Sequence, residues 1–316
     1  MAPHATENDT VEGYNGHGTE PVNAGEAPLE PGIKKSVAQG KMIEFPRPPK
    51  FDDKYKEREY LKGRLAAAFR IFGKYGFDEG VAGHITLRDP VEPDSFWVNP
   101  FGVAFSHINK SDLIRVDATG KVVDGGEVRL LNTAAYMIHH AVHVARPDVL
   151  CAAHSHSIYG RTWCTLGRKL DTITQDACAF HNDHVTYNSF NGVVLVEQEG
   201  KDIAACLGNK KAALLQNHGI LTVGKTIEEA STIHPSLISS ANVLQAVFWF
   251  LSMEKCCHSQ LMAEAAAAYR GDKLVIIDDE AAEYTKRTVG SPQAGWFNAK
   301  PTFDVIHRET GGSYLQ

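Results

Sequence analysis

The sequence predicts an α/β fold, in which amphipathic helices alternate with short buried strands. Large apolar residues recur at helical spacing over 54–76, a stretch that ends in two closely spaced glycines. Two apolar runs, 149–153 and 212–216, have the length and composition of buried strands. With 316 residues, the chain is long enough for one large domain or two small ones.

Composition and charge exclude several classes of protein. The chain is 43% hydrophobic, as is ordinary for a globular protein, and its net charge of −6 gives no general attraction to nucleic acid. No apolar stretch reaches the roughly 18–20 residues that span a bilayer, and the N-terminus lacks a signal-peptide pattern. The six cysteines lack CxxC spacing, so we expect reduced thiols and a cytoplasmic location.

The ends of the chain differ from its middle. Residues 1–50 are predicted to be a disordered tail, because they are nearly free of large apolar residues until Met42 and Ile43. The folded domain is expected over 51–270. We expect a C-terminal extension over 271–316, with one helix at 280–287 and a polar, glycine-rich end.

The remaining elements follow from apolar periodicity and turn residues. In the first half, we predict an alternating strand at 83–88, a strand into a turn at 96–102, a hairpin at 116–123 and a helix at 132–145. In the second half, we predict a helix at 158–166, strand or loop at 170–180, a strand at 193–196, a helix at 200–208, a strand at 221–224 and helices from 226 and over 247–269.

Three histidines stand where two of the buried strands end. His154 and His156 follow the apolar run 149–153, and they share a face because strand side chains alternate. The second run leads into His218, and the adjacent Gly219 allows close approach. Since imidazole is a common metal ligand, our hypothesis is a metal site of His154, His156 and His218. The alternative is that these histidines only form hydrogen bonds to the backbone.

Several motifs around these histidines occur together in one order. They are Arg146-Pro147-Asp148-Val149, His154-Ser155-His156, Leu215-Gln216-Asn217-His218-Gly219 with Gly224, and Glu228-Glu229-Ala230. With them, the chain resembles the class II aldolase/adducin family from about Glu59 to about Ala268. The resemblance implies three α/β/α layers around a mainly antiparallel sheet, and a homo-oligomer, most often a tetramer. It also implies a divalent metal at the three histidines, usually Zn²⁺, with Fe²⁺ or Mn²⁺ as alternatives.

The chain departs from the family pattern at two functional places. Sugar-phosphate aldolases of the family carry Gly-Asn-x-Ser-x-Arg where this chain has Gly83-His84-Ile85-Thr86-Leu87-Arg88. Gly83 and Thr86 are therefore candidate substrate-binding residues, with ordinary strand pairing as the alternative. The family's catalytic glutamate falls at Ala135, which cannot transfer a proton. Histidines 139, 140 and 143 remain possible substitutes. The polar cluster 180–184 is a separate candidate for the pocket, with a loop hydrogen-bonded to itself as the alternative.

Residues 231–246 separate Glu228-Glu229-Ala230 from the long helix that follows in the family. The segment contains Pro235, which would interrupt a helix at a cost of about 3 kcal/mol or more. We predict that it is an insertion into the family core, either a translated intron or a real loop.

Three functions remain open from the sequence. The first is a metal-dependent lyase or decarboxylase, acting on a small hydroxy-carbonyl compound by aldol, retro-aldol or decarboxylation chemistry. A metal would stabilise the enolate that forms when a bond beside a carbonyl breaks. The second is a non-catalytic adducin-like protein that binds the actin/spectrin cytoskeleton. The third is a catalytically silent scaffold stabilised by metal.

Replacing Ala135 by glutamate tests the interpretation of the missing acid/base. General acid–base catalysis contributes roughly 10²–10⁴ in rate, so Ala135→Glu should raise retro-aldol activity or shift its pH dependence. The rate should be measured with metal bound, together with the melting temperature. A stable, metal-loaded variant with an unchanged rate and pH profile would contradict this interpretation.

Overall fold

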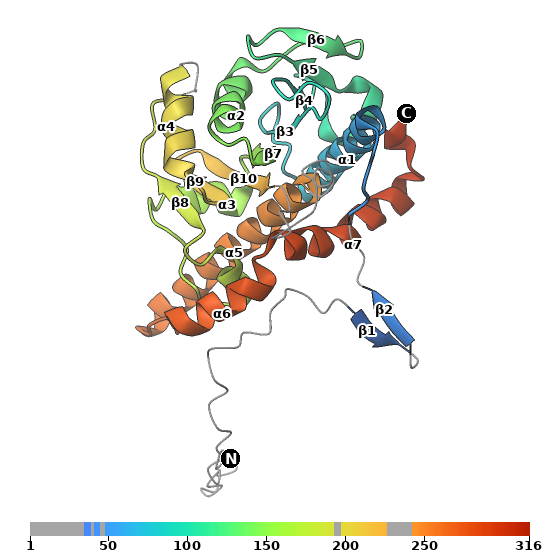
Figure 1. Cartoon of the computed structure of the whole chain (residues 1–316). Coiled ribbons are helices and arrows are strands. Elements are labelled where there is room, and N and C mark those ends of the chain that lie inside the picture. The colour runs from blue at the N-terminus through green and yellow to red at the C-terminus, as the bar shows by residue number, and fades with distance from the viewer. Residues whose placement is uncertain (1–34, 39–40, 45–47, 193–196, 226–241) are drawn as a thin grey trace, which may run out of the picture. The chain divides into compact units, whose positions relative to one another are not determined.

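The computed structural model describes residues 35–38, 41–44, 48–192, 197–225 and 242–316 (Figure 1). The predicted strand at 193–196 and the predicted start of a helix at 226–230 lie outside these residues. The side chain of Ala135 also lies outside the described part of the structure.

The centre of the fold is an eight-stranded sheet with the strand order β6-β5-β4-β3-β7-β10-β9-β8. In chain order, its strands are β3 (His84–Arg88), β4 (Phe96–Val98), β5 (Ile114–Val116), β6 (Val122–Gly125), β7 (Val149–Ser155), β8 (His184–Tyr187), β9 (Ala212–Leu215) and β10 (Gly219–Lys225). All neighbours pair antiparallel except β8 and β9, which are parallel. The predicted mainly antiparallel sheet is confirmed.

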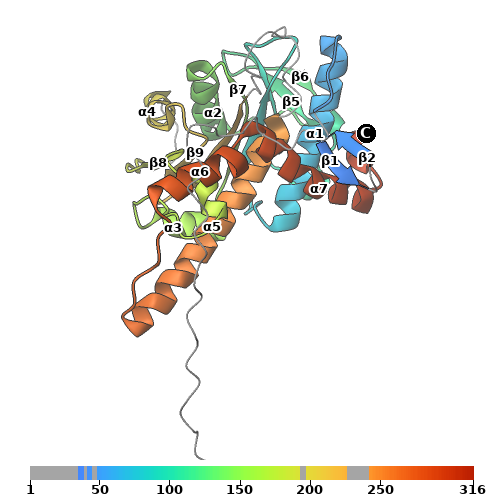
Figure 2. The ribbon, with the colours of Figure 1, turned by 60° about the horizontal axis from the view of Figure 1, so that its bottom comes forward.

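Helices cover both faces of this sheet (Figures 1 and 2). On one face lie α1 (Lys54–Tyr75), α3 (Ile158–Cys164), α5 (Asn242–Arg270) and α7 (Pro292–Thr310), and on the other lie α2 (Thr133–Ala145) and α4 (Glu197–Leu207). Adjacent residues of a strand point to opposite faces of the sheet and so belong to two separate hydrophobic cores. Ala153 and Ile220 pack with α1 and α5, whereas Ala152 and Leu221 pack with α2 and α4. The three-layer α/β/α architecture is therefore confirmed.

The remaining described elements are short or lie near the ends of the chain. They are β1 (Lys35–Ala38), β2 (Lys41–Glu44), α6 (Asp279–Val289) and the 3₁₀ turns η1 (Phe105–His107), η2 (Lys110–Asp112), η3 (Asp176–Phe180) and η6 (Ser313–Leu315). The sequence interpretation missed β1 and β2, which pair antiparallel inside the predicted tail. We expected no strands there because the segment has few apolar residues. In the structure, Val37 pairs with Met42 across the two strands.

Helix α7 is the largest departure from the predicted elements. The polar, glycine-rich end that we expected is instead a 19-residue helix that contacts α5 and α1. Its buried residues Trp296, Ala299, Phe303 and Ile306 recur at helical spacing. Pro301 lies inside this helix, where proline removes one backbone hydrogen bond.

The predicted insertion at 231–246 ends inside a helix of this structure. Residues 231–241 lie outside the described part of the chain, but 242–246 form the first turns of α5. Ala246 is fully buried, and its carbonyl accepts a hydrogen bond from Thr222 Oγ1 at 2.9 Å. Gln245 Oε1 accepts another from the Lys225 backbone N–H at 3.2 Å. Residues 245 and 246 therefore pack against the sheet in this chain, and an insertion at 231–246 relative to the family core remains a proposal.

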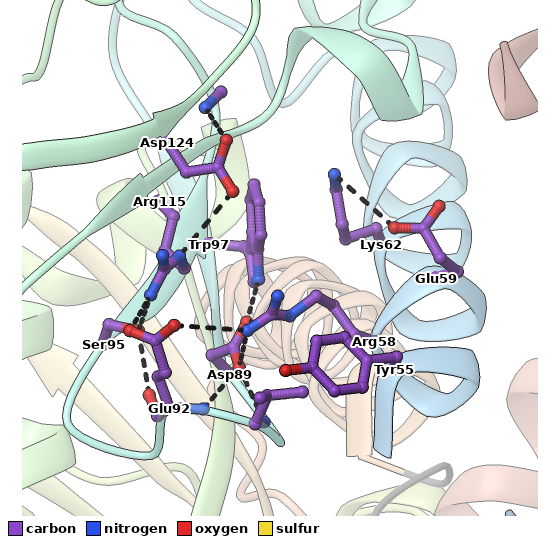
Figure 3. A network of polar contacts seen from close by, with 12 residues as sticks. Tyr55, Arg58, Glu59, Lys62, Asp89, Glu92, Ser95, Trp97, Arg115 and Asp124 are labelled. Atoms are coloured by element: carbon purple, nitrogen blue, oxygen red, sulfur yellow. Dashed lines mark hydrogen bonds and ion pairs between the residues drawn. The ribbon is translucent and has the colours of Figure 1, made fainter. Parts of the chain in front are cut away.

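A buried carboxylate joins α1 to the strands on its face of the sheet (Figure 3). Asp89 is fully buried and forms an ion pair with Arg58 of α1 at 2.8 Å. It also accepts hydrogen bonds from Trp97 Nε1 at 2.6 Å and from the backbone N–H groups of Val91 and Glu92 at 2.7 Å. Burial alone would raise the pKa of Asp89, but these hydrogen bonds outweigh it and lower the pKa below its usual value.

Removing this carboxylate should destabilise the fold strongly. Asp89→Ala removes the acceptor of Trp97 Nε1 and the nearest ion-pair partner of Arg58, which keeps Glu92 at 3.8 Å, so we expect the free energy of unfolding to fall by about 3–5 kcal/mol. Urea unfolding measures the loss. The control is Glu197→Ala, which breaks an exposed ion pair with Lys201 and should cost about 0.5 kcal/mol or less. A loss no larger than that of the control would contradict this account.

Candidate metal centre and cavity

The structure brings the three predicted histidines together. His154 lies near the end of β7, His156 follows that strand, and His218 lies in the turn between β9 and β10. One ring nitrogen from each lies within 4.8 Å of the others. The ring centroids are 4.7 to 5.2 Å apart. Three imidazoles converging on one point are the donor set of a metal centre with open coordination positions.

The backbone around His154 fixes which of its nitrogens is free. His154 Nδ1 lies 2.9 Å from the carbonyl oxygen of Ile220 on β10. A carbonyl only accepts hydrogen bonds, so Nδ1 carries the proton and Nε2 keeps its lone pair. A metal-binding histidine is commonly oriented by such a second hydrogen bond. The geometry of His154 therefore fits a metal ligand.

A tight turn holds His218 beside His154. Asn217 has a φ of +56°, in the left-handed region that asparagine tolerates better than most residues. At Gly219, an added Cβ would lie only 2.5 Å from the carbonyl oxygen of Ser155. Glycine is therefore required where β10 passes β7, and this close approach fixes the distance between the two histidines.

Burial keeps these imidazoles in the form that binds metals. It lowers the pKa of His154 well below its usual value, and lowers the pKa of His218 to about 4. Burial also lowers the pKa of His156, with help from the positive charge of Arg161. All three rings are therefore neutral at neutral pH, as metal coordination requires.

A buried glutamate fixes the chain just after His156. Glu254 of α5 accepts hydrogen bonds from Ser157 Oγ at 2.6 Å, from the Tyr159 backbone N–H at 2.9 Å and from the Gly160 backbone N–H at 2.6 Å. These contacts satisfy N–H groups at the start of α3. The sequence interpretation did not assign Glu254 this role, since the bonded residues are more than ninety positions away.

The three histidines face a cavity of about 870 Å³ with largely apolar walls. Its lining includes Val81, Gly83, His84, Phe101, Ile138, Phe190 and Arg161. Gly83 therefore lines this cavity, and its contact with a substrate remains a prediction. Among the described lining residues, Arg161 is the one cationic side chain, and it forms an ion pair with Glu79. No aspartate or glutamate is among these described residues.

Thr86 does not reach the cavity. It is 1% exposed, and its hydroxyl lies 2.7 Å from His139 Nδ1 and 2.8 Å from His143 Nε2. Both contacts are on the α2 side of the sheet. Thr86 therefore contacts histidines of α2 and not the cavity, and substrate binding by Thr86 is not part of the proposed site.

The other candidate histidines have different surroundings. His140 stacks on Tyr136, with ring centroids 4.9 Å apart, and lines a separate cavity of about 460 Å³. In the cluster 180–184, His184 Nδ1 donates to the Phe180 carbonyl at 2.8 Å, and its Nε2 accepts from the Leu170 backbone at 3.0 Å. These contacts satisfy both His184 nitrogens, so this ring has a structural role.

Sequence reasoning also assigned no role to His84. It is buried, lines the cavity, and pairs with His154 across β3 and β7. Within the described part of the chain, neither of its ring nitrogens has a hydrogen-bond partner, and neither has His139 Nε2. Side-chain alternation along 83–88 predicts that His84 and Thr86 share one face of the strand. It does not predict that this face lies against α2.

Comparison with known proteins gives one family. Residues 63–244 match the profile of the Class II Aldolase and Adducin N-terminal domain. Decarboxylase NovR of Streptomyces niveus is 42% identical over 262 residues, which cover 83% of this chain and 89% of that protein. The 4-hydroxy-3-prenylphenylpyruvate oxygenase/4-hydroxy-3-prenylbenzoate synthase of Streptomyces roseochromogenus subsp. oscitans is 41% identical, covering 83% of this chain and 87% of that protein.

Two further similarities extend this result. L-fuculose 1-phosphate aldolase from Glaciozyma antarctica PI12 has a solved structure with a TM-score of 0.75 at 42% identity, covering 85% of this chain and 97% of that chain. Alpha-adducin of Mus musculus is 28% identical over 80% of this chain, but over only 32% of the adducin. Separately, none of the helices in the described residues is long and apolar enough to cross a membrane.

Buried neutral histidines should make the fold sensitive to acid. Burial, with the charge of Arg88, lowers the pKa of His143 from 6.5 to about 3. As the pH falls below 6.5, the unfolded chain binds a proton that the folded His143 does not, so stability is lost between these two values. At pH 5.5 the loss is about 1.4 kcal/mol for each such histidine.

His143→Gln should therefore lose less stability on acidification than the unchanged chain, by about this amount. The measurement is urea unfolding at about pH 7.5 and about pH 5.5. Above about pH 7.5, where neither state of His143 binds a proton, the two proteins should show parallel curves. Equal acid sensitivity of both proteins would show that His143 does not titrate in this way.

Proposed function

Since this chain belongs to the class II aldolase and adducin family, we propose that it is a metal-dependent lyase acting on a small hydroxy-carbonyl compound. The observation that carries the proposal is the convergence of three neutral imidazoles, His154, His156 and His218, at the wall of a cavity of about 870 Å³. Such a wall can hold a small substrate against a metal and exclude water.

The donor set favours Zn²⁺, with Fe²⁺ or Mn²⁺ as alternatives. Three histidine nitrogens leave coordination positions open for a substrate. A bound divalent cation would polarise a carbonyl oxygen and stabilise the negative charge left when a neighbouring carbon–carbon bond breaks. The word oxygenase in the name of the relative from Streptomyces roseochromogenus subsp. oscitans supports Fe²⁺ as the alternative.

Within this class, the cavity favours decarboxylation over retro-aldol cleavage. A retro-aldol reaction starts when a base removes a hydroxyl proton. The described lining contains no carboxylate for that step, and His84 is its one imidazole outside the three proposed ligands. A substrate carboxylate is already ionised at neutral pH, so loss of carbon dioxide needs no base to begin. The name Decarboxylase NovR, given to a relative 42% identical to this chain, supports the same choice.

The cavity walls also bear on the substrate. Phe101, Ile138 and Phe190 offer apolar surface, whereas the positive charge of Arg161 is already paired with Glu79. A phosphate group needs several donors or charges to replace its water. An uncharged apolar substituent beside the reacting carbonyl suits these walls better than a phosphate.

Assembly and location are further parts of the proposal. We infer a homo-oligomer, most simply a tetramer, from family resemblance. A cytoplasmic location is supported by the cysteines, all six of which are free. The alternative function is binding to the actin/spectrin cytoskeleton, as in adducins. It rests on the similarity to alpha-adducin, which this chain matches over 32% of the adducin's length.

Metal analysis of His156→Ala tests the proposal. The unchanged protein should contain about one divalent metal per chain and release carbon dioxide from a suitable 3-oxo acid in a substrate screen, because that loss leaves an enolate on the metal-bound carbonyl. Removing one of three ligands should lower metal affinity by at least roughly 10–100-fold, the loss typical of weaker, outer-shell changes. The control is His140→Ala, outside the cavity of the three histidines. Full metal occupancy in His156→Ala would show that the site is wrong.

A further inference from the structure

Helix α3 connects the two metal ligands that lie in loops. It begins two residues after His156, and its last residue, Cys164, contacts the turn that carries His218. The carbonyl oxygen of Cys164 accepts a hydrogen bond from the Asn217 backbone N–H at 3.2 Å. The thiol of Cys164 donates to the Gly219 carbonyl oxygen at 3.3 Å. One residue of α3 is therefore hydrogen-bonded to the chain on both sides of His218.

The surroundings of Cys164 make its thiol a donor. Cys164 is 1% exposed, and burial raises its pKa to about 12, so it keeps its proton at neutral pH. A carbonyl oxygen only accepts hydrogen bonds, so the Sγ–H points to the Gly219 oxygen. An S–H group is a weak donor, and the backbone bond from Asn217 is the stronger of the two. Both bonds hold the turn only as firmly as α3 itself is held.

The beginning of α3 is held by Glu254. This carboxylate is 6% exposed and accepts hydrogen bonds from the Ser157 hydroxyl and from the backbone N–H groups of Tyr159 and Gly160. Bonds to a charged acceptor are stronger than neutral ones. Gly160 allows this approach, because an added Cβ would lie 2.9 Å from Glu254 Oε2 and 2.2 Å from Ile220 Cδ1. The helix therefore packs directly on α5 and β10.

We infer that α3 is a brace that sets the separation of His156 and His218, with Glu254 and Cys164 as positioning residues at its two ends. The helix has seven residues, fewer than the roughly 12–15 that an isolated helix needs, so its position depends on these end contacts. Movement at the Glu254 end is therefore transmitted to the turn at the Cys164 end. The inference deepens the proposed function and rests on it for the metal, whereas the brace itself needs no metal.

The first test measures the brace in the metal-free protein. Glu254→Gln keeps the size of the side chain but places an N–H group among three donors. Glu254 does not contact the Asn217 backbone N–H, yet NMR should show hydrogen exchange of this group roughly tenfold faster in the variant.

The matched control is Asp89→Asn, which changes another buried carboxylate, with partners on α1 and β4. In this variant, Asn217 should exchange within roughly twofold of the native rate. An equal increase in both variants overturns the brace, because Asn217 exchange would then report only overall stability.

The second test measures zinc affinity by competition with a chelating dye. Glu254→Gln should bind zinc roughly 10–100-fold more weakly than the native protein, the loss typical when the support of a ligand is removed. Cys164→Ala should lose roughly 3–10-fold, and Cys164→Ser should recover most of this loss, because its hydroxyl is also a donor. The control is Cys178→Ala, which removes another buried thiol, one that donates to the Thr174 carbonyl, and should keep native affinity.

A double variant distinguishes one brace from two separate supports. If α3 acts as a unit, freeing either end already releases it. Glu254→Gln combined with Cys164→Ala should then lose less zinc affinity than the product of the two single losses. A loss equal to that product overturns the inference, and so does native zinc affinity in Glu254→Gln. If Glu254→Gln does not fold, Ser157→Ala, which removes one of the three hydrogen bonds, replaces it in both tests.

The outcomes separate this inference from the proposed function. Failure of the native protein to bind zinc overturns the proposed function, and the Asn217 exchange rates then decide the inference alone.

Discussion

The pairing of β7 between β3 and β10 is the constraint on which the site depends. In this register, His154 stands opposite His84 on one side and Leu221 on the other. A shift of one residue would turn every β7 side chain to the opposite face, and His154 would then point toward α5. The donor geometry is therefore held by backbone hydrogen bonds of the central strands, with loops supplying only His156 and His218.

Sequence reasoning recovered what depends on short-range pattern and missed what depends on packing. The histidines at 154, 156 and 218 were predictable because each follows an apolar run typical of a buried strand. The surroundings of His84 were not predictable, because they depend on α2 crossing β3, more than fifty residues later in the chain. Helix α7 had a local signal in four correctly spaced apolar residues, which the prediction of a polar, glycine-rich end overlooked.

Burial has two separate effects on the histidines around the cavity. It removes their charge, since an imidazolium ion loses its hydration there. It also fixes which ring nitrogen carries the proton, because a buried carbonyl such as that of Val149 or Ile220 accepts a hydrogen bond from one nitrogen of the ring. Together these effects leave neutral rings in which the protein sets the nitrogen that carries the proton.

The contact between Glu254 and the start of α3 restricts where the chain can change in length. One residue inserted between Asn242 and Glu254 would rotate that carboxylate by about 100° around the α5 axis and move it by about 1.5 Å. The support for the segment after His156 would then be lost. Residues added before α5 change only the path into the helix, not its phase. Insertions or deletions before residue 242 are thus compatible with the site, whereas those in the next three turns of α5, up to Glu254, are not.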